Sequence, residues 1–103
     1  MRGCLRGCEV EDAGRLSRVF KALSVDTRVR IVQMLKERNL CVGALAARLG
    51  VSSAAVSQHL RILRDADLVV GEKHGYFVHY RLNPDTLDEW RALVTGLLDA
   101  DDG

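Results

Sequence analysis

Three cysteines, Cys4, Cys8 and Cys41, are the thiol side chains of this 103-residue chain. The opening MRGCLRGC is basic but lacks the apolar stretch of a secretory leader. Without export, and with an odd number of cysteines, a structural disulfide framework is not expected. Thiolates bind soft metal and metalloid ions, and paired thiols also close disulfides under oxidant or sulfane sulfur. The cysteines therefore predict a thiol-based site.

Polar side chains on one face of residues 53–66 suit a different chemistry, the reading of DNA. At 3.6 residues per turn, Val56, Leu60 and Leu63 fall on one helical face and His59 beside them, where we expect a packed, hydrogen-bonded role. The opposite face carries Ser53, Ala54, Ser57, Gln58, Arg61 and Arg64. Glutamine can form hydrogen bonds to adenine, serine can bond any base, and the methyl group of alanine can contact that of thymine. The arginines later in the helix suit phosphate contacts. A merely solvated face is the alternative.

The spacing within VGALAARLGVSSAAVSQHLRIL, residues 42–63, explains how such a helix would be positioned. Ala46 is small enough for two helices to approach, Gly50 fits the turn between them, and Val56 plugs the second helix into the core. This pattern is typical of a helix-turn-helix. We expect helices over 42–49 and 53–66, with Ser52 capping the second.

A β-hairpin is predicted directly after this unit. Residues 68–73 and 76–82 have the alternation of strands, with His74 and Gly75 as the turn. A hairpin that follows a recognition helix is a wing. Lys73 and Arg81 are predicted phosphate contacts, and solubility is the alternative role of a wing-tip lysine. The fold class is therefore mainly α with a small β-hairpin, a winged helix-turn-helix.

Two further helices with apolar stripes lie near the ends of the chain. The first begins at about Glu11, a second helix is capped by Ser24 or Asp26, and the last follows an Asn83 cap with Pro84 in first position. The stripes consist of Leu16, Val19, Phe20 and Leu23 and of Leu87, Trp90, Val94, Leu97 and Leu98. Packing on the core is the plain interpretation. We expect these helices also to form a homodimer interface, because one helix reads too few base pairs. Residues 1–10 are predicted to be a flexible arm and 11–100 the domain.

Charge is unevenly distributed, although the formal net charge is only +1. Residues 1–83 carry 14 of the 15 basic side chains and 8 of the 14 acidic ones, whereas residues 84–103 carry 1 and 6. The basic part fits a phosphate-facing surface. No apolar run approaches a membrane span, so a cytoplasmic protein is expected. An enzyme is not expected, because no nucleophile–base pair, phosphate-binding glycine loop or histidine cluster occurs.

Taken together, these motifs resemble the ArsR/SmtB family of metal- and metalloid-responsive repressors over roughly residues 16–98. FKALSVDTRVRIVQML, the SxHL pattern at Ser57–Leu60 and GYFVHYRLN are similar to the family's helices, reading head and wing. The resemblance implies a homodimer that binds double-stranded operator DNA and releases it when an inducer binds.

The resemblance also implies a metal site, with one departure. The family often carries a box of two cysteines and an acid before the first reading-head helix, whereas here only Cys41 is kept, and Gly43 and Ala44 replace the others. Some members supply cysteines from an N-terminal extension, which implies Cys4 and Cys8 as partners of Cys41. Three thiolates suit As(III) or Sb(III). Cd(II) or Pb(II), redox or reactive-sulfur sensing, and a structural Cys41 remain alternatives.

A second family site, for zinc on the last helix, is not expected here. That helix contains no histidine, and its acidic side chains make a poor zinc site: Asp85, Asp88, Glu89 and Asp99. We interpret them as a solvated acidic face.

Overall fold

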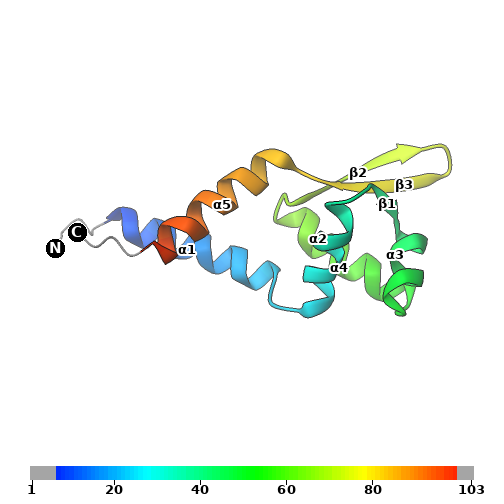
Figure 1. The fold of residues 1–103 in the computed structure, drawn as a ribbon, viewed down its shortest axis with the longest axis horizontal. Coiled ribbons are helices and arrows are strands. Elements are labelled where there is room, and N and C mark those ends of the chain that lie inside the picture. The colour runs from blue at the N-terminus through cyan, green and yellow to red at the C-terminus, as the bar shows by residue number, and fades with distance from the viewer. Residues whose placement is uncertain (1–6, 100–103) are drawn as a thin grey trace.

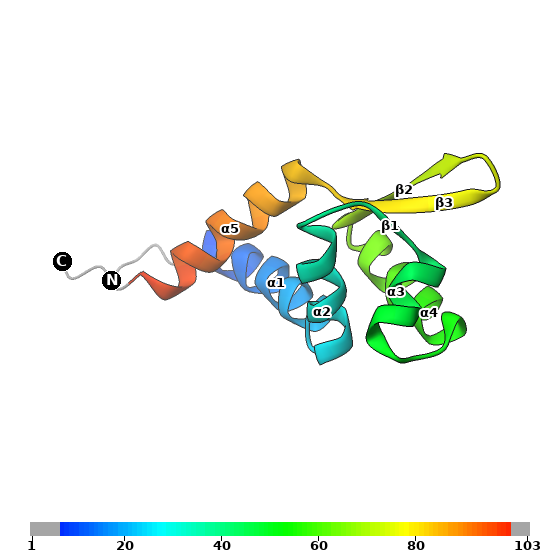
Figure 2. The ribbon, with the colours of Figure 1, turned by 45° about the vertical axis from the view of Figure 1, so that its right-hand side comes forward.

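The structure is a computed structural model that describes residues 7–99, with the backbone alone described for residues 7–12. The molecule is elongated, with extents of 54 × 24 × 20 Å. Two terminal helices lie together at one end, and a helix-turn-helix and a β-hairpin occupy the other (Figure 1). The same division is visible after a turn of the view (Figure 2). Within the described part of the chain, no helix is long and apolar enough to cross a membrane.

Helices α1 (Gly7–Ala22) and α2 (Asp26–Leu35) open the fold. Because α1 begins at Gly7, residues 7–10 are helical, so the predicted arm is four residues too long at this end; its residues 1–6 lie outside the described range. The predicted cap of α2 is also wrong. Val25 occupies the cap position without a side-chain bond, and the Ser24 hydroxyl instead donates to the Lys21 carbonyl at 2.9 Å.

Helices α3 (Val42–Leu49) and α4 (Ser53–Asp65) form the helix-turn-helix within one residue of the predicted bounds. Gly50 ends α3 with a positive φ of 70°, the left-handed conformation in which glycine is least strained. The Ser52 hydroxyl accepts a hydrogen bond from the Ala55 amide at 3.0 Å and so caps α4. The predicted turn and cap are both confirmed.

The sheet has three antiparallel strands in the order β1-β3-β2. Strands β2 (Val69–His74) and β3 (Phe77–Leu82) form the predicted wing, and Gly75, with a φ of 67°, lies in the turn between them. Strand β1 (Leu40–Cys41) was not predicted. It pairs with β3 and so joins the start of α3 to the wing.

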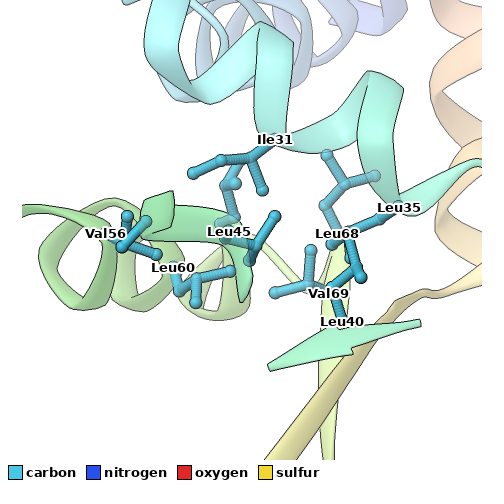
Figure 3. Packing of buried hydrophobic residues seen from close by; sticks show 10 residues of the cluster. Ile31, Leu35, Leu40, Leu45, Val56, Leu60, Leu68 and Val69 are labelled. Carbon is cyan, nitrogen blue, oxygen red and sulfur yellow. The ribbon is translucent and has the colours of Figure 1, made fainter. Parts of the chain in front are cut away.

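The hydrophobic core lies where α2, α3, α4 and the sheet meet (Figure 3). Its side chains are almost fully buried: Ile31, Leu35, Leu40, Leu45, Ala46, Val56, Leu60, Leu63, Leu68 and Val69. Burial of such side chains contributes about 1.5–3 kcal/mol each. Because the apolar face of α4 faces this core, its polar face is turned outward.

Helix α5 (Pro84–Leu98) follows the wing and packs along α1. The Asn83 side chain accepts from the Asp85 amide at 3.1 Å, and Pro84 fills the first position, as predicted. An ion pair between Arg15 and Glu89 joins the two helices. The α1–α5 pair therefore forms a module beside the core.

Candidate nucleic-acid interface and thiol site

The outer face of α4 carries all six helix residues predicted to read DNA. Their side chains are exposed: Ser53, Ala54, Ser57, Gln58, Arg61 and Arg64. Val56, Leu60 and Leu63 on the other face are at most 2% exposed, so α4 cannot turn without dismantling the core. Arg61 and Arg64 form no ion pair within residues 13–99. Their positive charges are therefore available to phosphates.

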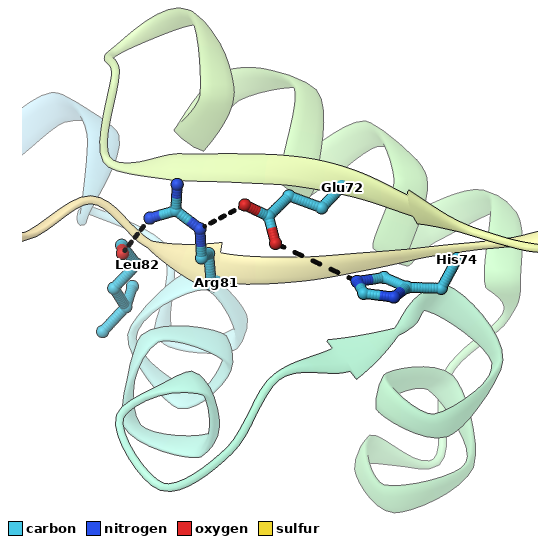
Figure 4. A network of polar contacts seen from close by, with 4 residues as sticks. All are labelled: Glu72, His74, Arg81 and Leu82. Carbon is cyan, nitrogen blue, oxygen red and sulfur yellow. Dashed lines mark hydrogen bonds and ion pairs between the residues drawn. The ribbon is translucent and has the colours of Figure 1, made fainter.

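The two predicted wing contacts differ in their surroundings. Lys73 is exposed on β2 and, in the part of the chain described here, has no acidic partner. Arg81 on β3 donates from Nε to Glu72 Oε2 at 2.9 Å and from Nη1 to the Leu82 carbonyl at 3.4 Å (Figure 4). A phosphate would therefore have to compete with Glu72 for Arg81.

Glu72 is held as a carboxylate by this arrangement. The hydrogen bond from Arg81, together with the charge of its guanidinium, lowers the pKa of Glu72 below its ordinary value of 4.5. His74 Nε2 lies 3.9 Å from the other carboxylate oxygen (Figure 4). A polar network of Glu72, His74 and Arg81 thus joins β2 to β3 on one face of the wing.

The tip of the wing carries an apolar surface that our sequence analysis did not single out. Tyr76 is 99% exposed and Phe77 62% exposed. Within residues 13–99 neither side chain is covered by another element, and no sequence signal indicated this exposure.

Cys41 lies in a setting that only the fold reveals. In the sheet, Cys41 is directly opposite His79, which is itself opposite Glu72. The neighbouring Leu40 is buried in the core, so Cys41 faces the outer side of the sheet, where it is half-buried and free. The thiol therefore lies between the start of α3 and the wing.

His79 beside it has a buried Nδ1 atom that finds no hydrogen-bond partner among residues 13–99. Its ring makes an edge contact with His74, with centroids 5.0 Å apart. Even so, residues 13–99 contain no group of three histidine, cysteine or acidic side chains placed to hold a metal ion. Further ligands for Cys41 would have to come from elsewhere.

The predicted ligands Cys4 and Cys8 are the obvious source. Cys4 lies outside the described residues. Cys8 lies in the first turn of α1, and its side chain is outside the described part. The three-cysteine site therefore remains a prediction.

The predicted dimer residues fall into three groups. Val19 is only 3% exposed and so packs within its own chain. Leu23, Leu87 and Trp90 pack against the core, and Leu16 and Val94 are half-buried. Phe20 and Leu97 are 46% and 53% exposed, and Leu98 is 72% exposed. Phe20 and Leu97, with Leu16, Ala92, Leu93 and Gly96, form the apolar part of an open groove between α1 and α5, which Arg15, Ser17 and Glu89 also line.

His59 has the packed, hydrogen-bonded position expected for it. It is half-buried on the side of α4 nearest α2, and its Nδ1 accepts from Arg28 Nε at 3.3 Å. The sequence indicated the role of His59, but nothing in it identified Arg28 as the partner 31 residues away.

Comparison with known proteins is consistent with this geometry. Residues 26–70 match the family described as bacterial regulatory protein, arsR family. Over 83 residues, the chain is 37% identical to the arsenic resistance transcriptional regulator ArsR1 of Pseudomonas putida. This match covers 80% of the chain and 65% of ArsR1, which is less than two thirds of the relative's length.

Solved structures give the same result. The crystal structure of a possible transcriptional regulator for arsenical resistance has a TM-score of 0.73 at 40% identity, covering 79% of this chain and 84% of that one. A homodimeric winged helix-turn-helix domain of Mycobacterium bovis, Mb0332, has a TM-score of 0.71 at 25% identity, covering 93% and 89%. These similar proteins are transcriptional regulators, not enzymes, and they confirm the winged helix-turn-helix fold.

Proposed function

Because this chain belongs to the ArsR family of bacterial regulatory proteins, we propose that it represses transcription by binding double-stranded operator DNA. The exposed polar face of α4 carries this proposal. Gln58, Ser53 and Ser57 would bond base edges, and Ala54 would contact a thymine methyl. Arg61, Arg64, Lys73 and Arg81 would contact phosphates.

A homodimer through α1 and α5 would supply the second reading helix. The exposed Phe20 and Leu97 and the apolar groove beside them support this, as does the homodimeric state of the similar Mb0332 domain. Two recognition helices would then enter the major groove about 34 Å apart, one turn of DNA. A single helix would bind with too little specificity at physiological salt.

The proposed inducer is As(III) or Sb(III), bound by the thiolates of Cys4, Cys8 and Cys41. The similarity to regulators of arsenic resistance supports this class of ligand. Cys41 immediately precedes α3 and pairs with the wing strand β3. A ligand that displaces its thiol would therefore shift both the helix-turn-helix and the wing. A coupling free energy of about 1–3 kcal/mol would weaken DNA binding by about 5- to 150-fold.

The test is a titration of the protein bound to fluorescent DNA from its own upstream promoter, followed by anisotropy under reducing conditions. Release by stoichiometric As(III) or Sb(III) is expected. Release by Cd(II) or Pb(II) alone would replace the proposed inducer with a soft divalent ion. Release by oxidant or persulfide alone would make the protein a redox sensor.

The proposed binding to DNA is tested by measuring how its affinity depends on salt concentration. A dimer that contacts phosphates loses affinity steeply as salt rises. Weak binding without a salt slope would contradict the proposal and indicate a winged helix that binds proteins.

A further inference from the structure

The Arg28 side chain links three helices, α1 of the terminal module and α2 and α4 of the core. Arg28 lies in α2. Its Nη1 donates to the carbonyl oxygens of Lys21 and Ala22, both at 3.1 Å, and its Nε donates to His59 Nδ1 at 3.3 Å. One planar guanidinium thus joins the last turn of α1 to the middle of α4.

The guanidinium of Arg28 supplies donors to three acceptors, two carbonyl oxygens of α1 and the Nδ1 atom of His59. The carbonyls at a helix C-terminus have no partner within the helix and carry the negative end of its dipole, so they attract a cation. Arginine has only donors, so His59 Nδ1 is the acceptor of the bond from Arg28 Nε. Because the donors of a planar guanidinium point in fixed directions, these bonds constrain the angle between α1 and α4.

Direct packing between α1 and α4 is sparse. An open pocket separates the two helices at this point, lined by Arg18 and Ala22 from α1, Ile62 and Asp65 from α4, and Arg28. The main packing partner of α1 is α5. Across the pocket, hydrogen bonds from Arg28 connect the end of α1 with the reading helix.

We propose that Arg28 is a positioning residue for DNA recognition, which sets the separation of the two reading helices in the dimer. The inference rests on the proposed dimer through α1 and α5. If α1 belongs to the dimer module and α4 reads DNA, the angle between them fixes how far apart the two half-sites must be. Arg28 would act through His59 and touch no DNA itself.

The experiment compares DNA duplexes with altered spacing. The wild-type protein first selects two-fold symmetric duplexes from a random pool, and a second duplex has two base pairs inserted between the half-sites. Anisotropy then gives the ratio of the two affinities, while a duplex with a single half-site measures the reading face alone. The spacing ratio is the affinity for the selected duplex divided by the affinity for the duplex with the insertion. We expect Arg28→Met to lower this ratio by about tenfold, equivalent to about 1.4 kcal/mol, and to leave the affinity for the half-site duplex unchanged.

Matched variants separate positioning from general damage. His59→Asn places an acceptor near the position of Nδ1 and should keep the wild-type ratio, whereas His59→Leu lacks the acceptor and should reproduce Arg28→Met. Arg30→Met, on the exposed side of α2, should keep the wild-type ratio. Light scattering and circular dichroism show that each variant is a folded dimer.

Three results would overturn the inference. These are a wild-type ratio in folded Arg28→Met, a wild-type ratio in His59→Leu, or an equal loss on half-site and full-site DNA. If Arg28→Met does not fold, His59→Leu decides. Failure of the wild-type protein to select symmetric DNA would instead contradict the proposed function.

Discussion

The proposed inducer and the proposed base contacts each depend on individual side chains. Cys41 is half-buried on the outer side of the sheet, opposite His79. Gln58 and Arg64 share the exposed face of α4 but differ in chemistry, because an amide can read a base edge and an arginine near the end of the helix can contact phosphate. Each role predicts a different outcome of substitution.

Replacing Cys41 should separate induction from DNA binding. Cys41→Ser removes a thiolate but keeps the size of the side chain, and it leaves the α4 face unchanged. We expect wild-type affinity for promoter DNA and loss of release by As(III), measured by anisotropy. A Cys41→Ser protein that As(III) still releases like wild type would show that the inducer binds elsewhere.

Replacing Gln58 or Arg64 should separate specificity from electrostatic attraction. Gln58→Ala should weaken the binding free energy for selected DNA by about 1–3 kcal/mol and that for random DNA only slightly, since it removes a base contact. Arg64→Gln should weaken both equally and reduce the salt slope by about 1, since it removes a phosphate contact. Affinities on both duplexes at several salt concentrations provide the measurement. A steeper loss on random DNA for Gln58→Ala would contradict the assignment.

At the scale of elements, the helix-turn-helix depends on one backbone conformation. Gly50 has a φ of 70°, and nothing lies within 4 Å of the position that a Cβ atom would occupy. Strain in the backbone, and not a clash, is therefore the cost of a side chain there. Gly43 in α3 has equally open surroundings and no positive φ, so it is a matched control.

The pair Gly50→Ala and Gly43→Ala should shift stability in opposite directions. Gly50→Ala should lower the free energy of unfolding by about 1–2 kcal/mol, because an L-residue is strained in the left-handed region. Gly43→Ala should raise it by about 0.5–1 kcal/mol, because alanine loses less entropy in a helix. Urea denaturation followed by circular dichroism measures both. Equal effects of the two substitutions would rule out backbone strain as the cause.

The wing should lose stability at acid pH. Arg81 lowers the pKa of Glu72 in the folded state, so their interaction stabilises the fold above the ordinary value of 4.5. The contribution disappears as the pH falls through the lowered pKa. We expect wild type to be more stable than Glu72→Gln at pH 7, with the difference vanishing below pH 4.5. An NMR titration in which Glu72 has a pKa of 4.5 or higher would contradict this.

On the scale of the whole molecule, the chain is more extended than its length requires. Its radius of gyration is 16.2 Å, against roughly 13 Å for a compact domain of this size. The α1–α5 module at one end and the β2–β3 hairpin at the other both reach away from the core (Figure 1), and the module exposes apolar side chains. This shape fits a module that is completed by a second copy.

A charge in this module should therefore break the dimer. Leu97→Glu places a carboxylate on the exposed apolar part of α5, and we expect a folded monomer with reduced affinity for symmetric DNA. Val29→Glu changes a side chain of α2 that is 37% exposed, away from the groove, and should leave the dimer intact. Sedimentation equilibrium measures both. A dimeric Leu97→Glu protein would exclude the face around Leu97 as the interface.

The local elements of this protein follow from short-range patterns in its sequence. The Ser52 and Asn83 caps, the left-handed Gly50 and the apolar period of α4 act over a few residues, so their structural consequences could be predicted without the fold. The same period predicted which face of α4 would be exposed. The cap of α2 was predicted incorrectly, because Ser24 bonds backward to Lys21 instead of forward into α2.

Contacts between residues far apart in the chain depend instead on how the elements pack. Strand β1 has two residues, too short for any alternation, and its pairing with β3 brings Cys41 opposite His79. The bond between Arg28 and His59 spans 31 residues and depends on how α2 packs on α4. Likewise, the apolar stripe of α1 did not distinguish the buried Val19 from the exposed Phe20. Periodicity gives the face of a helix, whereas burial depends on which other elements cover that face.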